Sequence, residues 1–236
     1  MPIDNQDFIK RLRAITSDII TDEERLAVYE SDGLTAKKQL PGVVVIPDTI
    51  EQVQAITALC QSCEVPLVPR GAGTGLSGGA MPHHEGVLLV MARFNQVLDV
   101  DTSTRTATVQ PGVTNLAISE AVSNLGLYYA PDPSSQIACT IGGNVAENSG
   151  GVHCLKYGLT VHNVKQLKVV LPGGELMVVG GKGYDTPGYD LLALMHGSEG
   201  MLGIVVEVIV QLLPKPPEVA VIMAAFSNVI DAANSV

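Results

Sequence analysis

A glycine-rich segment at residues 69–79 constrains this chain more than any other feature of its sequence. It reads PRGAGTGLSGG and follows directly on an apolar run, 65–69, that predicts a strand. Glycine permits positive φ and close backbone approach, so such a loop can curl its N–H groups around an anion. Hydrogen bonds to charged groups contribute about 1.5–3 kcal/mol each. Three or four of them would hold a pyrophosphate, which makes the segment a candidate binding site.

Two familiar nucleotide-binding loops share part of this pattern, and neither fits. In a Rossmann fold a helix begins within the motif, but here Gly78, Gly79 and Pro82 would fall in its first turns. Interior glycines cost about 1 kcal/mol each and an interior proline about 3, which disfavours that helix by roughly 5 kcal/mol. A P-loop needs lysine where Leu76 stands, so ATP chemistry is excluded. A tight surface loop without a ligand remains the alternative.

Strands and helices alternate around this segment. Thr49 and Gln52 form a capping box, in which both side chains satisfy early helix donors, and an amphipathic helix follows. A second helix is expected over 115–125, with Gly126 as its C-terminal stop. Strands are predicted at 43–46, 65–69, 87–91 and 206–212, with hairpins that pair 97–100 with 106–110 and 167–171 with 176–179.

The last residues predict the start of a separate unit. A stiff proline-rich linker occupies 214–217, a strand is expected over 219–226, and a helix follows from Ser227. The sequence ends at Val236 inside this helix without a cap. We therefore expect a truncated chain whose second domain is missing.

Two further stretches are rich in small residues. The first joins 131–135 to 140–151 and is almost uncharged, and the second covers 196–205 and leads into the late strand. Irregular connections of such length are functional or disordered, and the apolar residues in these two favour order. Three small-residue loops on one α+β scaffold indicate an extended cofactor that lies across the chain.

The motifs PRGAGTGLSGG, APDPSS, TIGGNVAENSGG and GSEGMLGI together resemble the FAD-binding domain shared with vanillyl-alcohol oxidase, of the PCMH type. Within that family the chain is similar to the FAD-linked subunits of glycolate oxidase and D-lactate dehydrogenase. The resemblance covers residues 41–217. It implies an α+β fold of two lobes with FAD between them, an N-terminal helical segment at 1–40 and the start of a C-terminal substrate or cap domain at 218–236.

The resemblance also implies which residues contact the cofactor. The first loop would hold the pyrophosphate through its amides, with Arg70, Gly71, Ala72, Gly73, Thr74, Gly75, Ser77, Gly78 and Gly79. The flavin would lie against Pro131, Asp132, Thr140, Gly143, Asn144, Ser149, Gly150 and Gly151, and the adenine end against Gly203, Ile204 and Val205. Some relatives attach the flavin covalently to a histidine where this chain has Thr74, so we expect non-covalent FAD.

The implied activity is oxidation of glycolate, D-lactate or a similar 2-hydroxy acid to the 2-oxo acid, with hydride transfer to the flavin. The resemblance places the catalytic and metal-binding residues in the later domain, so no catalytic residue and no metal ligand is assigned here. His153 and His162 flank the second loop and are the best histidine candidates for a base, although structural roles are more common. A module that binds FAD without turnover and a non-flavin anion-binding domain remain alternatives.

Charge and hydropathy limit the partners. The formal net charge is -10 and no Lys/Arg run compensates for it, which argues against nucleic acid. No apolar run approaches the ~20 residues of a transmembrane helix, and the first residues do not resemble a secretory signal. We expect a cytoplasmic protein that reaches the inner membrane only through partners. The resemblance implies an iron–sulfur protein and further subunits of an oxidase complex among them.

Four cysteines complete the candidate residues. Cys60 and Cys63 match C-x-x-C but fall at the end of the first predicted helix, whereas thioredoxin-like pairs open one. Two core-facing thiols are therefore expected there. Asp32 is expected to cap a turn.

Overall fold

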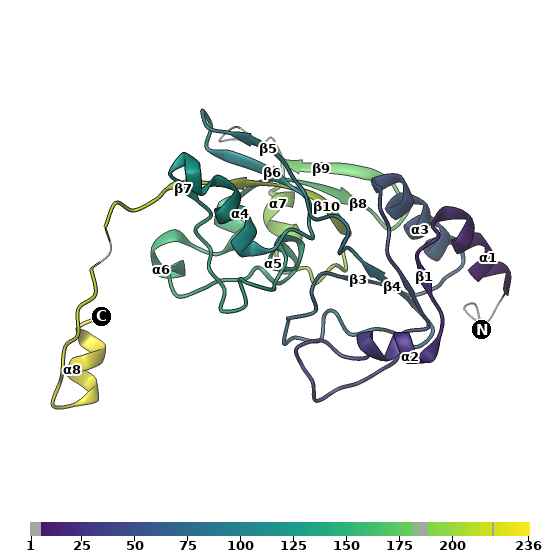
Figure 1. Ribbon diagram of the computed structural model, residues 1–236, viewed down its shortest axis with the longest axis horizontal. Coiled ribbons are helices and arrows are strands. Elements are labelled where there is room, and N and C mark those ends of the chain that lie inside the picture. The colour runs from purple at the N-terminus through teal and green to yellow at the C-terminus, as the bar shows by residue number, and fades with distance from the viewer. Residues whose placement is uncertain (1–5, 182, 184–187, 219) are drawn as a thin grey trace.

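The strands of this chain form two main sheets, each with its own helices (Figure 1). The computed structural model describes residues 6–181, 183, 188–218 and 220–236. The first sheet has the order β1-β2-β4-β3, formed by Ile19–Ile20, Val43–Val45, Val87–Val90 and Leu67–Arg70. β2, β4 and β3 run parallel, and β1 pairs antiparallel with β2. The N-terminal segment therefore contributes a strand to this lobe as well as helices.

The second sheet is antiparallel and larger. Its order is β5-β6-β10-β8-β9, formed by Val97–Asp101, Thr106–Val109, Ile204–Gln211, Val164–Val170 and Leu176–Gly180. A separate pair joins β11 (Leu213–Pro214) to β7 (Leu127–Tyr128). The two predicted hairpins and the predicted late strand are confirmed, with bounds that differ from the prediction by up to three residues.

Helices cover these sheets. In chain order they are α1 Gln6–Ile15, α2 Glu23–Leu26, α3 Ile50–Ser62, α4 Asn115–Val122, α5 Ile141–Glu147, α6 Cys154–Tyr157, α7 Leu191–Met195 and α8 Val229–Asn234. Short 3-10 turns lie at η1 Ala27–Tyr29, η2 Ser123–Leu125 and η3 Thr160–Asn163. The predicted start of α3 is confirmed: Thr49 accepts a hydrogen bond from the Gln52 amide (3.3 Å), while the Gln52 side chain accepts from the Asp48 amide (2.7 Å). Gly126 ends the second predicted helix with φ 67°.

The two lobes share an apolar core. Val53 and Ile56 of α3 are fully buried and pack in one cluster with Val45 of the first sheet and Val206 of the second. A second cluster lies between the larger sheet and α4, α5 and α7. Burying such aliphatic side chains contributes about 1.5–3 kcal/mol each, so the lobes are held firmly together. The expected α+β fold of two lobes is confirmed.

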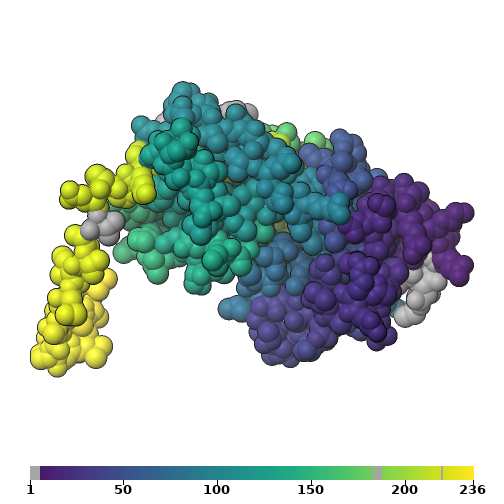
Figure 2. Space-filling model, in the orientation of Figure 1, coloured from purple at the N-terminus to yellow at the C-terminus, as the bar shows by residue number. Residues whose placement is uncertain are grey.

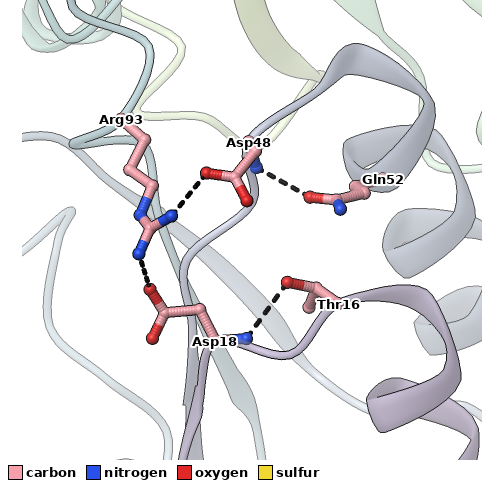
Figure 3. Close-up of polar contacts among 5 residues, drawn as sticks. All are labelled: Thr16, Asp18, Asp48, Gln52 and Arg93. Atoms are coloured by element: carbon pink, nitrogen blue, oxygen red, sulfur yellow. Dashed lines mark hydrogen bonds and ion pairs between the residues drawn. The ribbon is translucent and has the colours of Figure 1, made fainter.

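A cluster of charges ties three segments of the first lobe together (Figure 3). Arg93, just after β4, donates to Asp18 (2.5 Å) and to Asp48 (2.7 Å), and Asp18 precedes β1 while Asp48 precedes α3. These carboxylates and hydrogen bonds raise the pKa of Arg93. The guanidinium fixes the entry of α3 against the edge of the sheet.

The last part of the chain differs from the prediction. Residues 220–226 form no strand, since no other described segment pairs with them, and Val219 lies outside the described residues. The predicted helix is present as α8 with Asn228 as its N-cap, but it ends at Asn234 with Ser235 as its C-cap, so the expectation that the chain stops in mid-helix is wrong. Figure 2 shows this tail apart from the body. Residues 1–5 of the predicted N-terminal segment lie outside the described residues.

Candidate functional site

The first glycine-rich segment forms an irregular loop between β3 and β4. β3 ends at Arg70, and residues 71–86 contain neither helix nor strand, as the exclusion of a Rossmann helix predicts. Gly73 and Gly78 have positive φ angles of 69° and 87°. Within the described part of the chain, the N–H groups of residues 72–76 have no hydrogen-bond acceptor. Five consecutive unpaired amides in a partly buried loop are a ready set of donors for an anion.

Arg70 supports this loop from one side. Its guanidinium packs against Gly73, lies 5.9 Å from the centre of the Tyr29 ring and donates to the Ala80 carbonyl (3.4 Å). Burial lowers the pKa of Arg70, and the nearby Asp32 opposes that shift. Asp32 accepts from the Leu34 amide (2.8 Å), which confirms its predicted role in a turn.

The second small-residue stretch was expected to be a continuous irregular loop, but that expectation is wrong, because it contains the helix α5. Thr140 is its N-cap and accepts from the Gly143 amide (3.4 Å), and Asn148 ends it with φ 48°. Gly142 and Gly143 lower helix propensity but fit close packing, because a Cβ on Gly142 would lie 2.7 Å from Pro111. Sequence propensity alone therefore missed an element that tertiary packing stabilises.

Asn144 organises a buried polar network on α5. Its side chain is 2% exposed, accepts from the Asn115 amide group (2.9 Å), and donates to Cys139 Sγ (3.3 Å) and Ser149 Oγ (3.4 Å). Buried polar groups need such partners, so the network fixes the positions of Cys139 and Ser149. Both residues line the cavity described below.

The third stretch follows α7 and attaches to the end of α5. The Gly197 amide donates to the Val145 carbonyl (3.0 Å), and the Glu199 amide donates to the Ala146 carbonyl (2.9 Å). Gly203 then packs against Val169 of β8, where β10 begins. These contacts bring the second and third small-residue stretches together.

A cavity of about 360 Å³ lies between the three stretches. Its wall includes fourteen of the predicted cofactor-binding residues: Arg70, Gly71, Ala72, Gly73, Thr74, Gly75, Gly79, Thr140, Gly143, Asn144, Ser149, Gly203, Ile204 and Val205. The other six, which lie outside this wall, are Ser77, Gly78, Pro131, Asp132, Gly150 and Gly151. Gly151 packs against Asp132, so this pair stays together beside the second stretch.

Two acidic side chains of the wall were not predicted. Glu147 ends α5, and Glu199 follows with φ 53° in the third stretch. Ser77 Oγ donates to the Glu147 carboxylate, at 2.8 Å from Oε1 and 3.0 Å from Oε2. Glu147 and Glu199 carry the charges within two otherwise uncharged motifs, and that contrast was the signal available in the sequence.

The histidine candidates lie outside the wall of this cavity. His153 Nδ1 is 2.6 Å from Asp132 Oδ2, and His162 Nδ1 accepts from the Leu159 amide (3.0 Å). His196 Nδ1 donates to the Leu192 carbonyl (2.7 Å), and burial lowers its pKa. The contacts of His162 and His196 are structural, while the ring of His153 is held by a carboxylate near the second stretch.

The cysteines, histidines and carboxylates of the described residues form no metal site. Cys60 is buried, which raises its pKa to about 12, and Cys63 accepts a hydrogen bond from Arg11 (3.4 Å). Among the described residues, no group of three or more His, Cys, Asp or Glu side chains is placed to bind a metal ion. No described helix is long and apolar enough to span a bilayer.

The donors and shape of the cavity fit part of a dinucleotide cofactor. Unpaired loop amides match a pyrophosphate, and a Cβ on Gly71 would overlap Thr140 Oγ1. A Cβ on Gly79 would lie 2.9 Å from Glu199 Oε2. A side chain at position 71 would therefore collide with the N-cap of α5, and one at position 79 would press on the Glu199 side chain of the third stretch.

Comparisons with known proteins agree with this geometry. A family described as FAD binding domain matches residues 41–180. Glycolate oxidase subunit GlcD of Escherichia coli (strain K12) is 59% identical over 212 residues, which are 90% of this chain and 42% of that protein. D-lactate dehydrogenase of Anaerostipes hadrus is 36% identical over 223 residues, which are 93% of this chain and 45% of that protein. The chain thus spans less than half the length of these relatives.

The solved structures show the same fold at lower identity. Alkyldihydroxyacetonephosphate synthase superposes with a TM-score of 0.80 and 23% identity, over 92% of this chain and 43% of that chain. At this identity the likeness supports the fold alone.

Proposed function

The chain belongs to the family of FAD-binding domains, and from that premise we propose that it carries the FAD of a flavin-dependent 2-hydroxy-acid dehydrogenase. The substrate would be glycolate, D-lactate or a similar 2-hydroxy acid, and the product the 2-oxo acid. The similarity to a glycolate oxidase subunit and to a D-lactate dehydrogenase supports this substrate class.

The unpaired amides of the first loop are the observation that carries the proposal. Residues 72–76 would donate to the pyrophosphate, and Arg70 would keep the loop in its receptive shape from behind. Such preformed donors lose little entropy on binding, so they contribute more to affinity than a flexible loop would.

The two ends of the cofactor would then lie on either side of this loop. Thr140, Asn144 and Ser149 would line the flavin, with Asp132 and Gly151 nearby, and 203–205 would lie by the adenine. Bound FAD supplies the acceptor for the hydride that leaves the substrate carbon. The Asn144 network would keep the wall beside the flavin rigid and exclude water from it.

FAD would be held without a covalent bond. Thr74 lines the cavity in the first loop, where some relatives have the histidine that bonds the flavin. A threonine hydroxyl is a poor nucleophile without an adjacent base, and among the described residues no base is hydrogen-bonded to it. Affinity would come from hydrogen bonds and packing alone.

The domain limits and partners extend this proposal. Residues 41–217 would form the FAD-binding domain, 1–40 its N-terminal segment and 218–236 the link to a substrate or cap domain. Electrons would leave the flavin through further subunits, among them an iron–sulfur protein. The word subunit in the name of the glycolate oxidase relative supports a multi-subunit setting.

Anaerobic addition of glycolate or D-lactate tests the substrate class. The FAD-loaded chain is compared with the same chain fused to the C-terminal part of the similar glycolate oxidase subunit, and the visible flavin band is followed. We expect the band to bleach in the fusion and to persist in the chain alone. If dithionite bleaches the flavin band of the fusion but neither glycolate nor D-lactate does, the result would contradict the substrate class and favour a module that only binds FAD.

A further inference from the structure

We propose that Glu147 binds the cofactor by accepting a hydrogen bond from one of its sugar hydroxyls, next to the pyrophosphate. The inference rests on the cofactor site proposed above. Glu147 lines the cavity at the end of α5, opposite the first loop.

The Glu147 carboxylate has unused capacity to accept hydrogen bonds. Ser77 Oγ lies within hydrogen-bond distance of both oxygens, but its one proton can bond only one of them at a time. A carboxylate offers about four acceptor sites. Among the described residues, Ser77 is the only hydrogen-bond donor found for it. Most of its acceptor sites therefore remain open in a partly buried position.

The surroundings of this carboxylate are negative rather than positive. Glu147 ends a helix, where the partial charge of the backbone is negative. A second carboxylate, that of Glu199, flanks the same glycine: a Cβ on Gly79 would lie 3.1 Å from Glu147 Oε1 and 2.9 Å from Glu199 Oε2. Both carboxylates would also repel a pyrophosphate held by the loop. A hydroxyl donor on the ligand would turn this repulsion at Glu147 into an attraction.

Phosphate oxygens cannot supply that donor, but sugar hydroxyls can. FAD carries hydroxyls on both sides of its pyrophosphate, on the ribityl chain and on the ribose. A hydrogen bond from a hydroxyl to a carboxylate is charge-assisted and short, about 2.5–2.7 Å. Glu147 would thus recognise the sugar that adjoins the bound anion.

The substitution Glu147→Gln tests this in the 236-residue chain, because it keeps the size of the side chain and removes its charge. FAD binding is measured by quenching of flavin fluorescence, and binding of inorganic pyrophosphate, which has no hydroxyl, by competition with FAD. We expect the variant to bind FAD about tenfold more weakly or worse, and pyrophosphate more tightly. A loss of FAD affinity together with a gain of pyrophosphate affinity identifies the hydroxyl contact.

Two other results would overturn the inference. If both ligands bind more tightly, Glu147 only repels them. If both bind more weakly and Ser77→Ala reproduces the loss, Glu147 only supports the loop. Glu175→Gln is the matched control, since it removes the same charge at an exposed turn away from the cavity.

ADP and FMN identify the sugar. A loss of ADP affinity in Glu147→Gln assigns the contact to the ribose, a loss of FMN affinity assigns it to the ribityl chain, and a loss of neither contradicts it. A wild-type chain that fails to bind FAD at all would instead contradict the proposed function.

Discussion

Gly73 holds a backbone conformation that a side chain would disturb. Its φ is 69°, and a Cβ there would overlap the guanidinium of Arg70. We expect Gly73→Ala to displace Arg70 from the loop and to weaken FAD binding about tenfold or more, as measured by fluorescence titration.

Gly126→Ala is the matched control for this change. Gly126 has nearly the same φ, 67°, but among the described residues nothing beyond its chain neighbours lies within 4 Å of where a Cβ would stand, and it is outside the cavity wall. Gly126→Ala should lower the free energy of unfolding by about 1 kcal/mol and leave FAD affinity unchanged. Equal FAD affinities in the two variants would refute the role given to Gly73.

His196 should make stability depend on pH. Burial lowers its pKa from the ordinary 6.5, and its Nε2 has no partner among the described residues. As pH falls through about 6.5, the unfolded chain binds a proton before the folded chain does, so stability is lost. Urea unfolding at about pH 8 and about pH 5.5 should show a larger loss in the wild type than in His196→Gln. An equal loss in both proteins would show that His196 does not contribute.

At the scale of elements, α5 depends on its buried network. Asn144→Ala leaves the Asn115 side chain without its acceptor and Ser149 without a donor. Each unsatisfied buried group costs about 1–3 kcal/mol, so both the free energy of unfolding and the FAD affinity should fall. Denaturant unfolding and FAD titration measure the two effects. The control Asn124→Ala, at an exposed position of η2, should change neither the free energy of unfolding nor the FAD affinity. If Asn144→Ala also leaves both quantities unchanged, the network is dispensable.

The charges that hold the entry of α3 give a second test. Arg93→Ala should lower the midpoint of thermal unfolding by a small amount, and added salt should reduce the difference from the wild type. Arg13→Ala removes an exposed charge with no ion pair among the described residues and serves as control. A difference that persists in high salt would mean that Arg93 acts through packing.

The elements differ in how well the sequence predicts them. Strong apolar patterns predict the strands at 43–45 and 204–211, and a clear N-cap adds to the apolar pattern of the helix at 50–62. All three predictions are confirmed. α5 escaped because its two glycines lower helix propensity, although Thr140 offered a cap. The strand expected at 219–226 failed because an apolar pattern alone does not supply a neighbouring strand.

The candidate site, too, could be predicted only in part from the sequence. Motifs located the three stretches, and the cavity wall contains residues from each of them. Glu147 and Glu199 were missed because the sequence does not show which side chains face an anion-binding loop. Their single charges in otherwise uncharged motifs marked them as unusual, but the folded contacts, such as that of Ser77 with Glu147, are needed to show where they face.

At the scale of the whole molecule, the two lobes form one frame around the cavity. The first lobe contributes the loop after β3, and the second contributes α5 and the segment before β10. Since the lobes share a core through α3, the loop amides and the opposite wall are held in fixed relation before the cofactor binds. The frame explains how a chain with a net charge of -10 can still hold an anionic cofactor: backbone amides, rather than a basic surface, would bind it.

The visible absorption spectrum of the purified chain, before and after acid precipitation, tests the central claim most directly. The account predicts a flavin band that moves to the supernatant and proves to be FAD. A band that stays with the pellet would contradict the non-covalent attachment inferred at Thr74. A colourless chain that also fails to bind added FAD would contradict the cofactor site itself.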